Sequence, residues 1–207
     1  MSERERFLAD YDVPRGTIEA FDRYSALLSE WQSRMNLVAS STLDQLWQRH
    51  FADSAQLVRL GPRAAGRWID LGSGAGFPGV VVALLAEHHV TLVEATGKKC
   101  RFLEAVVEQL GITNVTVCNS RIEAVSPGGF DVISARACAP LAKLFELGSS
   151  IAQPDTCWLL LKGGTVETEV EAARQSFNFS ARLEPSRTDP RGRIVVANHV
   201  RRRITGR

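Results

Sequence analysis

The sequence predicts an α/β fold in which a mostly parallel, seven-stranded β-sheet contains one antiparallel strand and follows a helical extension. Three observations predict it. After about residue 66, short β-rich runs alternate with helical stretches. The first of these runs ends in a glycine-rich loop that opens onto a helix, at residues 72–79. Before residue 62, apolar residues recur at three- and four-residue intervals, which is the period of a helix.

The chain has the composition of an ordinary globular protein. Its 207 residues, 44% of them hydrophobic, are enough for one substantial core. No run of about 18 apolar residues appears, and residues 1–6 lack the apolar segment of a signal peptide. We therefore expect a cytoplasmic protein with no membrane partner. The cysteines lie singly, which favours neither a metal site nor a disulfide framework: Cys100, Cys118, Cys138 and Cys157.

Residues 1–62 are expected to form a helical extension that packs on a second part, residues 63–207. A first apolar stripe follows Thr17, a candidate N-cap, and comprises Ile18, Phe21, Tyr24, Leu28 and Trp31. A second stripe follows Ser41 and Thr42 and comprises Leu43, Leu46, Trp47, His50 and Phe51. Gly61 and Pro62 are expected to end this segment.

The second part is expected to contain seven strands and four helices. The predicted strands are 67–71, 90–94, 114–118, 130–134, 157–161, 178–184 and 193–199, and the predicted helices are 78–87, 98–110, 140–148 and 166–175. Residues 188–192 join the last two strands without a helix. These two strands should therefore pair as a hairpin, which places one antiparallel strand in the sheet.

The glycine loop and the acid after the next strand predict a nucleoside site. In a dinucleotide site, loop N–H groups receive a pyrophosphate, which a carboxylate at Asp70 would repel. S-adenosylmethionine carries no phosphate. Its cationic methionine end suits Asp70, and its ribose hydroxyls can donate to Glu94. A formal Gly-x-Gly-x-x-Gly exists at Gly74, Gly76 and Gly79, but it starts late relative to the strand.

The charge of the chain permits a nucleic-acid partner without requiring one. The net charge is +2, but the basic residues are clustered. The clusters are Lys98, Lys99 and Arg101; Arg187, Arg191 and Arg193; and Arg201, Arg202, Arg203 and Arg207. A polyanion can meet several charges at once in such clusters, and solvated helix ends or tails are the alternative.

Several further motifs occur in one order over nearly the whole chain. They are Met35–Leu37, Arg49–Ser54, Asp70–Gly79, Gly97–Lys99 before Arg101–Leu103, Ser120–Glu123, Phe130–Ser134 with Arg136–Ala137, and Leu161–Gly163. Together they resemble the ribosomal RNA small subunit methyltransferase G family (RsmG, also called GidB). Two positions depart from the family's pattern. Val38 stands where threonine is common, and Lys99 stands where arginine is common.

The resemblance implies a Rossmann-like class I S-adenosylmethionine-dependent methyltransferase fold. It also implies methyl transfer to N7 of a guanine in 16S ribosomal RNA, guanine 527 in the family's usual rRNA numbering. The RNA partner is then 16S rRNA or the small ribosomal subunit. The donor-binding residues are expected to be Asp70, Gly72, Gly74, Phe77, Glu94, Ile122, Glu123 and Arg136. Of these, Glu94 would hold the ribose, and Ile122 with Glu123 would flank the adenine.

This chemistry requires no catalytic acid or base, and we assign no catalytic residue. Guanine N7 has a free lone pair and no proton, so the protein's task is alignment. His50 and Asp53 are spaced as a possible acid/base pair, but we favour a buried, hydrogen-bonded His50. Lys162 and Gly163 follow the fifth predicted strand and are expected to border the RNA pocket.

Two other functions remain open on the sequence alone. An NAD(P)-dependent oxidoreductase can use a similar sheet, and nicotinamide titration separates it from a methyltransferase. A non-catalytic RNA-binding module can retain the pocket, and failure to transfer a methyl group identifies it. We expect a monomer, although no sequence motif addresses the oligomeric state.

Overall fold

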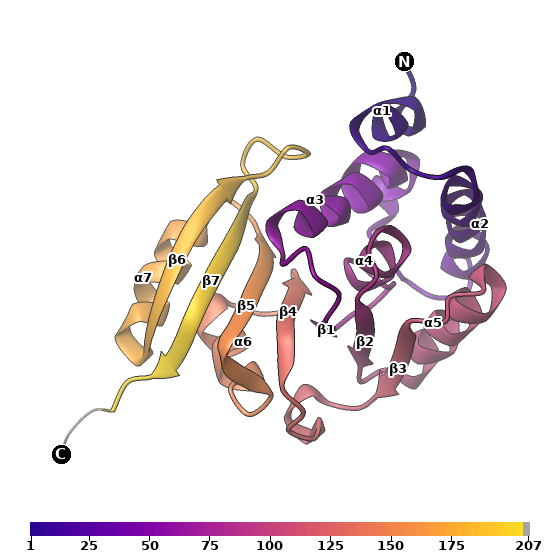
Figure 1. The fold of residues 1–207 in the computed structure, drawn as a ribbon. Helices are drawn as coiled ribbons and strands as arrows, with labels where there is room; N and C mark the ends of the chain where they lie inside the picture. Colours follow the sequence, from indigo (N-terminus) through magenta and orange to yellow (C-terminus); the bar gives the residue numbers. More distant parts are fainter. Residues whose placement is uncertain (205–207) are drawn as a thin grey trace.

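The computed structural model describes residues 1–204 and shows one seven-stranded sheet with helices on both faces (Figure 1). Arg207, which belongs to the last basic cluster of the sequence, lies outside the described residues. The strands are β1 (Arg67–Leu71), β2 (His89–Glu94), β3 (Val115–Asn119), β4 (Phe130–Arg136), β5 (Ala152–Lys162), β6 (Phe177–Pro185) and β7 (Arg193–Arg202). Their order across the sheet is β3-β2-β1-β4-β5-β7-β6.

The predicted sheet topology is confirmed. The strands β1 to β5 pair in parallel, whereas β7 runs antiparallel to both of its neighbours, β5 and β6. The main differences from the predicted ranges are that β4 continues to Arg136 and that β5 begins at Ala152. The extension of β4 matters for function because it makes Arg136 the last residue of a central strand.

The sheet separates two apolar layers. One layer is covered by α2 (Arg15–Gln32), α3 (Asp53–Leu60), α4 (Gly79–Leu85) and α5 (Gly97–Leu110). The other is covered by α6 (Leu141–Gly148) and α7 (Val166–Ser176). Successive residues of β1 fall into opposite layers, Trp68 into the first and Ile69 into the second, and both are fully buried. Both faces of the central strands are therefore apolar, as a parallel sheet with helices on each side requires.

The N-terminal segment is helical, but less regular than its apolar pattern predicts. It contains α1 (Glu3–Asp10), α2, the short 3-10 helix η1 (Ser40–Gln45), the π-helix η2 (Trp47–Ala52) and α3. The prediction that Thr17 is an N-cap is wrong, because the Thr17 N–H already donates to Pro14 O at 2.9 Å inside α2. The predicted second helix changes type twice. Three consecutive residues, His50–Ala52, are buried in η2, which one stripe of a regular α-helix does not allow.

Aromatic side chains join the N-terminal helices to the glycine loop. The Tyr24 ring lies 5.4 Å from both the Phe51 and the Phe77 rings, measured between centroids. The Tyr24 hydroxyl donates to Ala75 O in the loop. Because the loop packs directly on α2, the first 62 residues share a core with the sheet. The division of the chain at residue 62 stays a prediction.

Gly79 allows α4 to begin close to β1 and β2. A Cβ atom at this position would overlap a Leu92 methyl carbon and lie 3.0 Å from the Asp70 Cβ. Both atoms belong to buried residues, so neither can move aside freely.

We predict that Gly79→Ala lowers the free energy of unfolding by about 1–3 kcal/mol, the usual cost of overpacking a core. Gly16→Ala is the matched control, because Gly16 also lies in the first turn of a helix and a methyl group there would have no atom within 4 Å. Alanine at position 16 should be neutral or stabilising by up to about 1 kcal/mol. Urea unfolding of both variants measures the difference, and equal stabilities would contradict the prediction.

Candidate functional site

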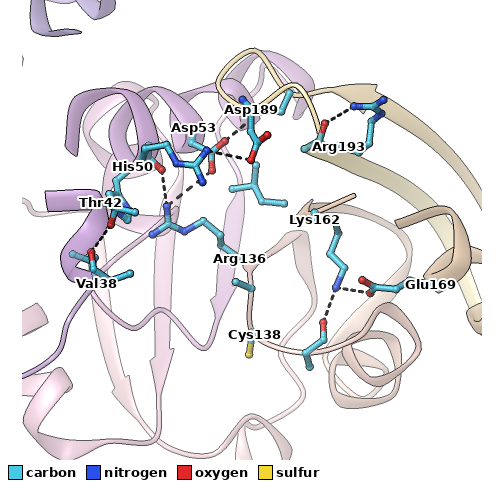
Figure 2. Close-up of a pocket in the computed structure, with 18 of the residues that line it drawn as sticks. Val38, Thr42, His50, Asp53, Arg136, Cys138, Lys162, Glu169, Asp189 and Arg193 are labelled. Carbon is cyan, nitrogen blue, oxygen red and sulfur yellow. Dashed lines mark hydrogen bonds and ion pairs between the residues drawn. The ribbon is translucent and has the colours of Figure 1, made fainter. Parts of the chain in front are cut away.

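Two adjoining cavities lie at the carboxyl ends of the parallel strands, where ligands bind in open α/β sheets. The loop cavity, of about 670 Å³, lies between the glycine loop, the end of β2 and residues 120–123. The hairpin cavity, of about 600 Å³, lies between residues 37–53, the end of β5 and the β6–β7 loop (Figure 2). Both cavities share one wall, formed by Leu37, Arg136, Ala137 and Cys138.

The glycine loop has a backbone that only glycine adopts easily. Gly72, Gly74 and Gly76 have φ angles of +67°, +58° and +90°. A Cβ atom on Gly72 would also lie 2.5 Å from the Cys138 Sγ on the shared wall. The loop is fixed to β2 by the Ser73 N–H, which donates to Val93 O at 2.9 Å. The glycines therefore bring the backbone close to the loop cavity.

Glu94 ends β2 and holds the loop from the opposite side. Its Oε2 accepts from the Gly74 N–H at 3.0 Å, and its Oε1 accepts from the Thr96 N–H at 2.7 Å. Only 8% of the residue is exposed, and the carboxylate lines the loop cavity. Its oxygens thus lie beside the cavity with further lone pairs for a ligand's hydroxyl groups.

Asp70 is the one predicted donor-site residue that lines neither cavity. Its side chain is fully buried, with Oδ1 accepting from Ser134 Oγ at 2.7 Å and Oδ2 accepting from the Gly79 N–H at 3.3 Å. Burial raises the pKa of this carboxyl to about 6, against the hydrogen bonds from Ser134, Ser73 and Gly79 that lower it. Asp70 therefore holds the end of the loop and the start of α4 through the Gly79 N–H, from the side away from the cavities.

The other seven predicted residues all line the loop cavity: Gly72, Gly74, Phe77, Glu94, Ile122, Glu123 and Arg136. Ile122 and Glu123 lie in the short 3-10 helix η3 (Ile122–Ala124), across the cavity from the loop. Ala137 and Cys138 also line this cavity, although they are not among the predicted donor-site residues. Ala137 has a φ angle of +48°, a rare conformation for alanine that no sequence pattern indicates.

Arg136 forms the joint between the two cavities. Its guanidinium lies 4.8 Å from the centre of the Phe77 ring, donates to Arg49 O at 3.2 Å and lies 4.0 Å from Asp53 Oδ2. Its side chain is 19% exposed, and burial lowers its pKa. Arg136 therefore contacts the glycine loop and the N-terminal helices at once.

His50 and Asp53 do not pair with each other, since His50 bonds with Thr42 and Asp53 faces Arg136. The His50 ring lies 4.9 Å from the Phe77 ring, and its Nε2 bonds with Thr42 Oγ1 at 2.8 Å. Burial and the nearby guanidinium groups of Arg136 and Arg49 lower its pKa to about 3, which keeps the imidazole neutral. The structure thus gives His50 the buried, hydrogen-bonded role that the sequence analysis favours.

Lys162 and Gly163 lie on the wall of the hairpin cavity. The Lys162 ammonium donates to Ala139 O at 2.7 Å and pairs with Glu169 Oε2 at 2.6 Å (Figure 2). The same Glu169 oxygen accepts from the Leu141 N–H at the start of α6. This pair fixes residues 137–140, which follow Arg136 along the shared wall.

The described residues include no group of three or more histidine, cysteine, aspartate or glutamate side chains arranged to hold a metal ion. Within the same part of the chain, no helix is long and apolar enough to span a membrane.

The fold is that of S-adenosylmethionine-dependent methyltransferases. A SAM-dependent methyltransferase from Aquifex aeolicus has a TM-score of 0.56 at 16% identity, over 70% of this chain and 88% of that one. A ribosomal protein L11 methylase from Lactobacillus delbrueckii subsp. bulgaricus has a TM-score of 0.58 at 19% identity, over 73% and 77%. These identities are low, so the likeness shows the class of fold.

The family follows from comparison at the level of sequence. The model of the family described as rRNA small subunit methyltransferase G matches residues 17–188. A protein named ribosomal RNA small subunit methyltransferase G from Rhizorhabdus wittichii is 45% identical over 100% of this chain and 97% of its own length. One of the same name from Zymomonas mobilis is 43% identical, over 91% and 88%. The chain belongs to the rRNA small subunit methyltransferase G family, as its sequence motifs indicate.

Asp70 and His50 should contribute opposite pH dependences to stability. The folded Asp70 carboxyl has a pKa of about 6 instead of 3.8, so its contribution is present at low pH and is lost as the pH rises to about 6. The folded His50 has a pKa of about 3 instead of 6.5, so stability rises with pH over that interval. The two slopes oppose each other between about pH 4 and 6.

We predict that Asp70→Asn removes the first slope. Relative to the unmodified protein, the variant should gain about 2 kcal/mol of unfolding free energy between pH 4 and pH 7, the part of the pKa difference that falls within this range. Urea unfolding across this range measures the gap between the two proteins. Asp44→Asn, on the exposed surface, is the charge-matched control. A gap for Asp70→Asn that does not change with pH contradicts the prediction.

Proposed function

We propose that the protein transfers the methyl group of S-adenosylmethionine to N7 of a guanine in 16S ribosomal RNA, guanine 527 in the family's usual numbering. The names of its full-length relatives support an rRNA substrate. The observation that carries the proposal is that two cavities, one suited to the donor and one to RNA, meet at Arg136, Ala137 and Cys138. We also propose that the reaction takes place in the cytoplasm and that the protein is a monomer.

The loop cavity fits the donor through one carboxylate acceptor and one apolar side chain. The Glu94 carboxylate has room to accept from the ribose hydroxyls, and Ile122 provides an apolar contact for the adenine. Gly72, Gly74 and Phe77 line the opposite side. A structural neighbour, MtNAS, was crystallised with S-adenosylmethionine and has a TM-score of 0.60 at 17% identity, over 87% of this chain and 74% of that one.

The carboxylates that hold the loop oppose a dinucleotide. In a dinucleotide site, N–H groups of the glycine loop and of the following helix face a pyrophosphate. Here the Gly74 N–H donates to Glu94, and the Gly79 N–H at the start of α4 donates to Asp70. A pyrophosphate at these groups would meet two carboxylates. The Asp70 carboxylate therefore opposes a pyrophosphate at this site, as its place in the sequence predicts, although it lies on the side of the loop away from the cavity.

The hairpin cavity fits an RNA nucleotide. Four cations line it, Arg49, Arg136, Lys162 and Arg193, together with three acids, Asp53, Glu169 and Asp189. Its wall also includes the apolar side chains of Leu37, Val38 and Leu161. A purine base can therefore contact apolar groups there while cations face its phosphates.

The chain's contribution to catalysis is alignment and charge placement. When bound, S-adenosylmethionine supplies an electrophilic methyl group on a sulfonium. The residues of the shared wall hold the guanine and the donor in line, which can contribute several kcal/mol through proximity. Guanine N7 carries no proton, so no side chain must remove one. The low pKa of His50 agrees with this, because a neutral, buried imidazole adds no positive charge beside the reacting atoms.

Mapping of the methylated nucleotide tests the proposal directly. Unmethylated 30S subunits and free 16S rRNA are each incubated with the protein and S-adenosylmethionine carrying a labelled methyl group. We predict one N7-methylguanine at the expected position, detected by cleavage at the modified base. Methylation elsewhere would overturn the assigned position, and no transfer to either substrate would favour a non-catalytic RNA-binding module. NAD binding in place of the methyl donor would favour an oxidoreductase.

We predict that Glu94→Ala weakens S-adenosylmethionine binding about 10- to 100-fold, because hydrogen bonds to a carboxylate contribute about 1.5–3 kcal/mol each. Glu94→Gln keeps one acceptor oxygen and should lose less. Glu104→Ala, an exposed acid on α5, is the control. Calorimetric titration measures all three, and unchanged affinity in Glu94→Ala contradicts the ribose assignment.

A further inference from the structure

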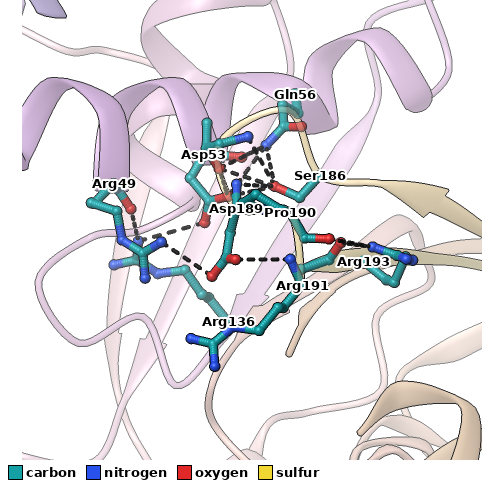
Figure 3. Close-up of polar contacts among 11 residues, drawn as sticks. Arg49, Asp53, Gln56, Arg136, Ser186, Asp189, Pro190, Arg191 and Arg193 are labelled. Carbon is teal, nitrogen blue, oxygen red and sulfur yellow. Dashed lines mark hydrogen bonds and ion pairs between the residues drawn. The ribbon is translucent and has the colours of Figure 1, made fainter. Parts of the chain in front are cut away.

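The β6–β7 loop, residues 186–192, reaches across one side of the hairpin cavity and contacts the N-terminal helices (Figure 3). Its contacts come from residues more than 120 positions earlier in the sequence. They divide into two sets of different strength, one at the base of the loop and one at its tip.

The base of the loop is firmly held by α3. Asp53 Oδ1 accepts from Thr188 Oγ1 at 2.5 Å and from Ser186 Oγ at 3.4 Å. Gln56 Oε1 accepts from the Arg187 N–H at 2.7 Å. Gln56 is 5% exposed and the Asp53 side chain is 18% exposed, so these bonds are largely shielded from water.

The tip of the loop is held by one partly exposed ion pair. Asp189 Oδ2 accepts from Arg49 Nη1 at 3.1 Å, with side-chain exposures of 27% for Asp189 and 39% for Arg49 (Figure 3). Asp189 Oδ1 accepts from the Arg191 N–H at 2.9 Å. An arginine and a backbone N–H are the donors that proteins use to bind RNA and DNA phosphates. The Asp189 carboxylate therefore occupies a position in which a phosphate can be bound.

The surroundings of Asp189 are positive. Arg191 is exposed beside it, and the Arg193 guanidinium lies on the cavity wall and donates to Pro190 O and Gly192 O. Within residues 1–204, neither of these two arginines forms an ion pair with a carboxylate. Arg191 and Arg193 therefore add positive charge to the loop that carries Asp189.

We propose that Arg49 binds a backbone phosphate of the RNA substrate, and that this phosphate displaces the Asp189 carboxylate as the RNA enters the hairpin cavity. The inference rests on the RNA substrate of the proposed function. A partly exposed ion pair contributes little to stability, so its exchange for a phosphate costs little. The bonds of Asp53 and Gln56 keep the base of the loop in place while the tip moves.

Arg136 does not take this role, although it lines the same cavity. It is less exposed than Arg49, and its carboxylate partner Asp53 is held by Thr188 and Ser186 at the base of the loop. Its own guanidinium is also directed to Arg49 O and the Phe77 ring. Release of Arg136 would break this buried network, whereas release of Arg49 requires only movement of the loop tip.

Salt-dependent RNA binding tests the inference without requiring methyl transfer. Unmethylated 16S rRNA is titrated with the protein at several KCl concentrations, and the slope of log affinity against log salt is measured. Loss of one phosphate contact in Arg49→Gln should reduce the magnitude of the slope by about 0.7–0.9. Arg49→Lys, which keeps the charge, should retain it. Asp189→Asn should bind about two- to fivefold more tightly at fixed salt, the factor expected for loss of a competing surface ion pair.

Matched controls lie at the opposite end of the sheet. Arg182→Gln and Asp155→Asn make the same changes of net charge beside a cavity lined by the first residues of β4 and β5. If Arg49→Gln has the slope of Arg182→Gln, or if Asp189→Asn binds no more tightly than Asp155→Asn, the phosphate site is overturned. Thermal melting and S-adenosylmethionine binding verify that each variant is folded.

Methylation and RNA binding together distinguish a missing phosphate site from a missing activity. If the protein methylates the RNA but its Arg49 and Asp189 variants behave as their controls do, the methyltransferase function stands. The phosphate site at Arg49 is then overturned. If the protein neither binds nor methylates the RNA at low salt, both the proposed function and the phosphate site at Arg49 are overturned.

Discussion

Two carboxylates hold the N–H groups of the glycine loop, and the arrangement of the site depends on these contacts. Glu94 binds the Gly74 N–H from the end of β2, and Asp70 binds the Gly79 N–H from the end of β1. The N–H groups of a glycine loop and of the helix that follows it otherwise favour an anion. Here the negative charge is built into the protein. Beside the loop, the Glu94 carboxylate can accept from the hydroxyl groups of a ligand, and the cations Lys99, Arg121 and Arg136 also line the cavity.

The second constraint is the position of Arg136 between three parts of the molecule. Its guanidinium contacts Phe77 in the glycine loop and Arg49 O in η2, and it faces Asp53 at the start of α3. Removal of a buried cation from such a set would leave Asp53 without its charged partner, which is costly in a shielded environment. Arg136 thus links the geometry of the loop cavity to that of the hairpin cavity. The N-terminal helices line the hairpin cavity, to which they supply Arg49, His50 and Asp53.

The acids of the hairpin cavity share a common arrangement. Asp53, Glu169 and Asp189 each pair with a cation and also accept from an uncharged donor of a nearby loop or helix start. Each acid therefore fixes the direction of a cation and the position of a backbone segment together. The pairs differ in shielding, from Lys162 at 7% side-chain exposure to Arg49 at 39%. Because Arg49 is the most exposed of these cations, it is the one that can exchange its carboxylate partner for a phosphate at the least cost.

The sequence by itself determined the α/β class, the order of the strands along the chain, the antiparallel hairpin and seven of the residues around the loop cavity. The class, the strands and the hairpin follow from local causes, chiefly apolar periodicity and turn residues. Most of the cavity residues, including Ile122, Glu123 and Arg136, follow from the resemblance of the motifs to a known family. Only the tertiary structure decided that Asp70 lies behind the loop, that Leu46 to Leu60 change helix type, and that Asp189 pairs with Arg49. The last contact joins residues 140 positions apart. Such contacts depend on which strand ends and loops the folded sheet brings together, and no local pattern of side chains specifies them.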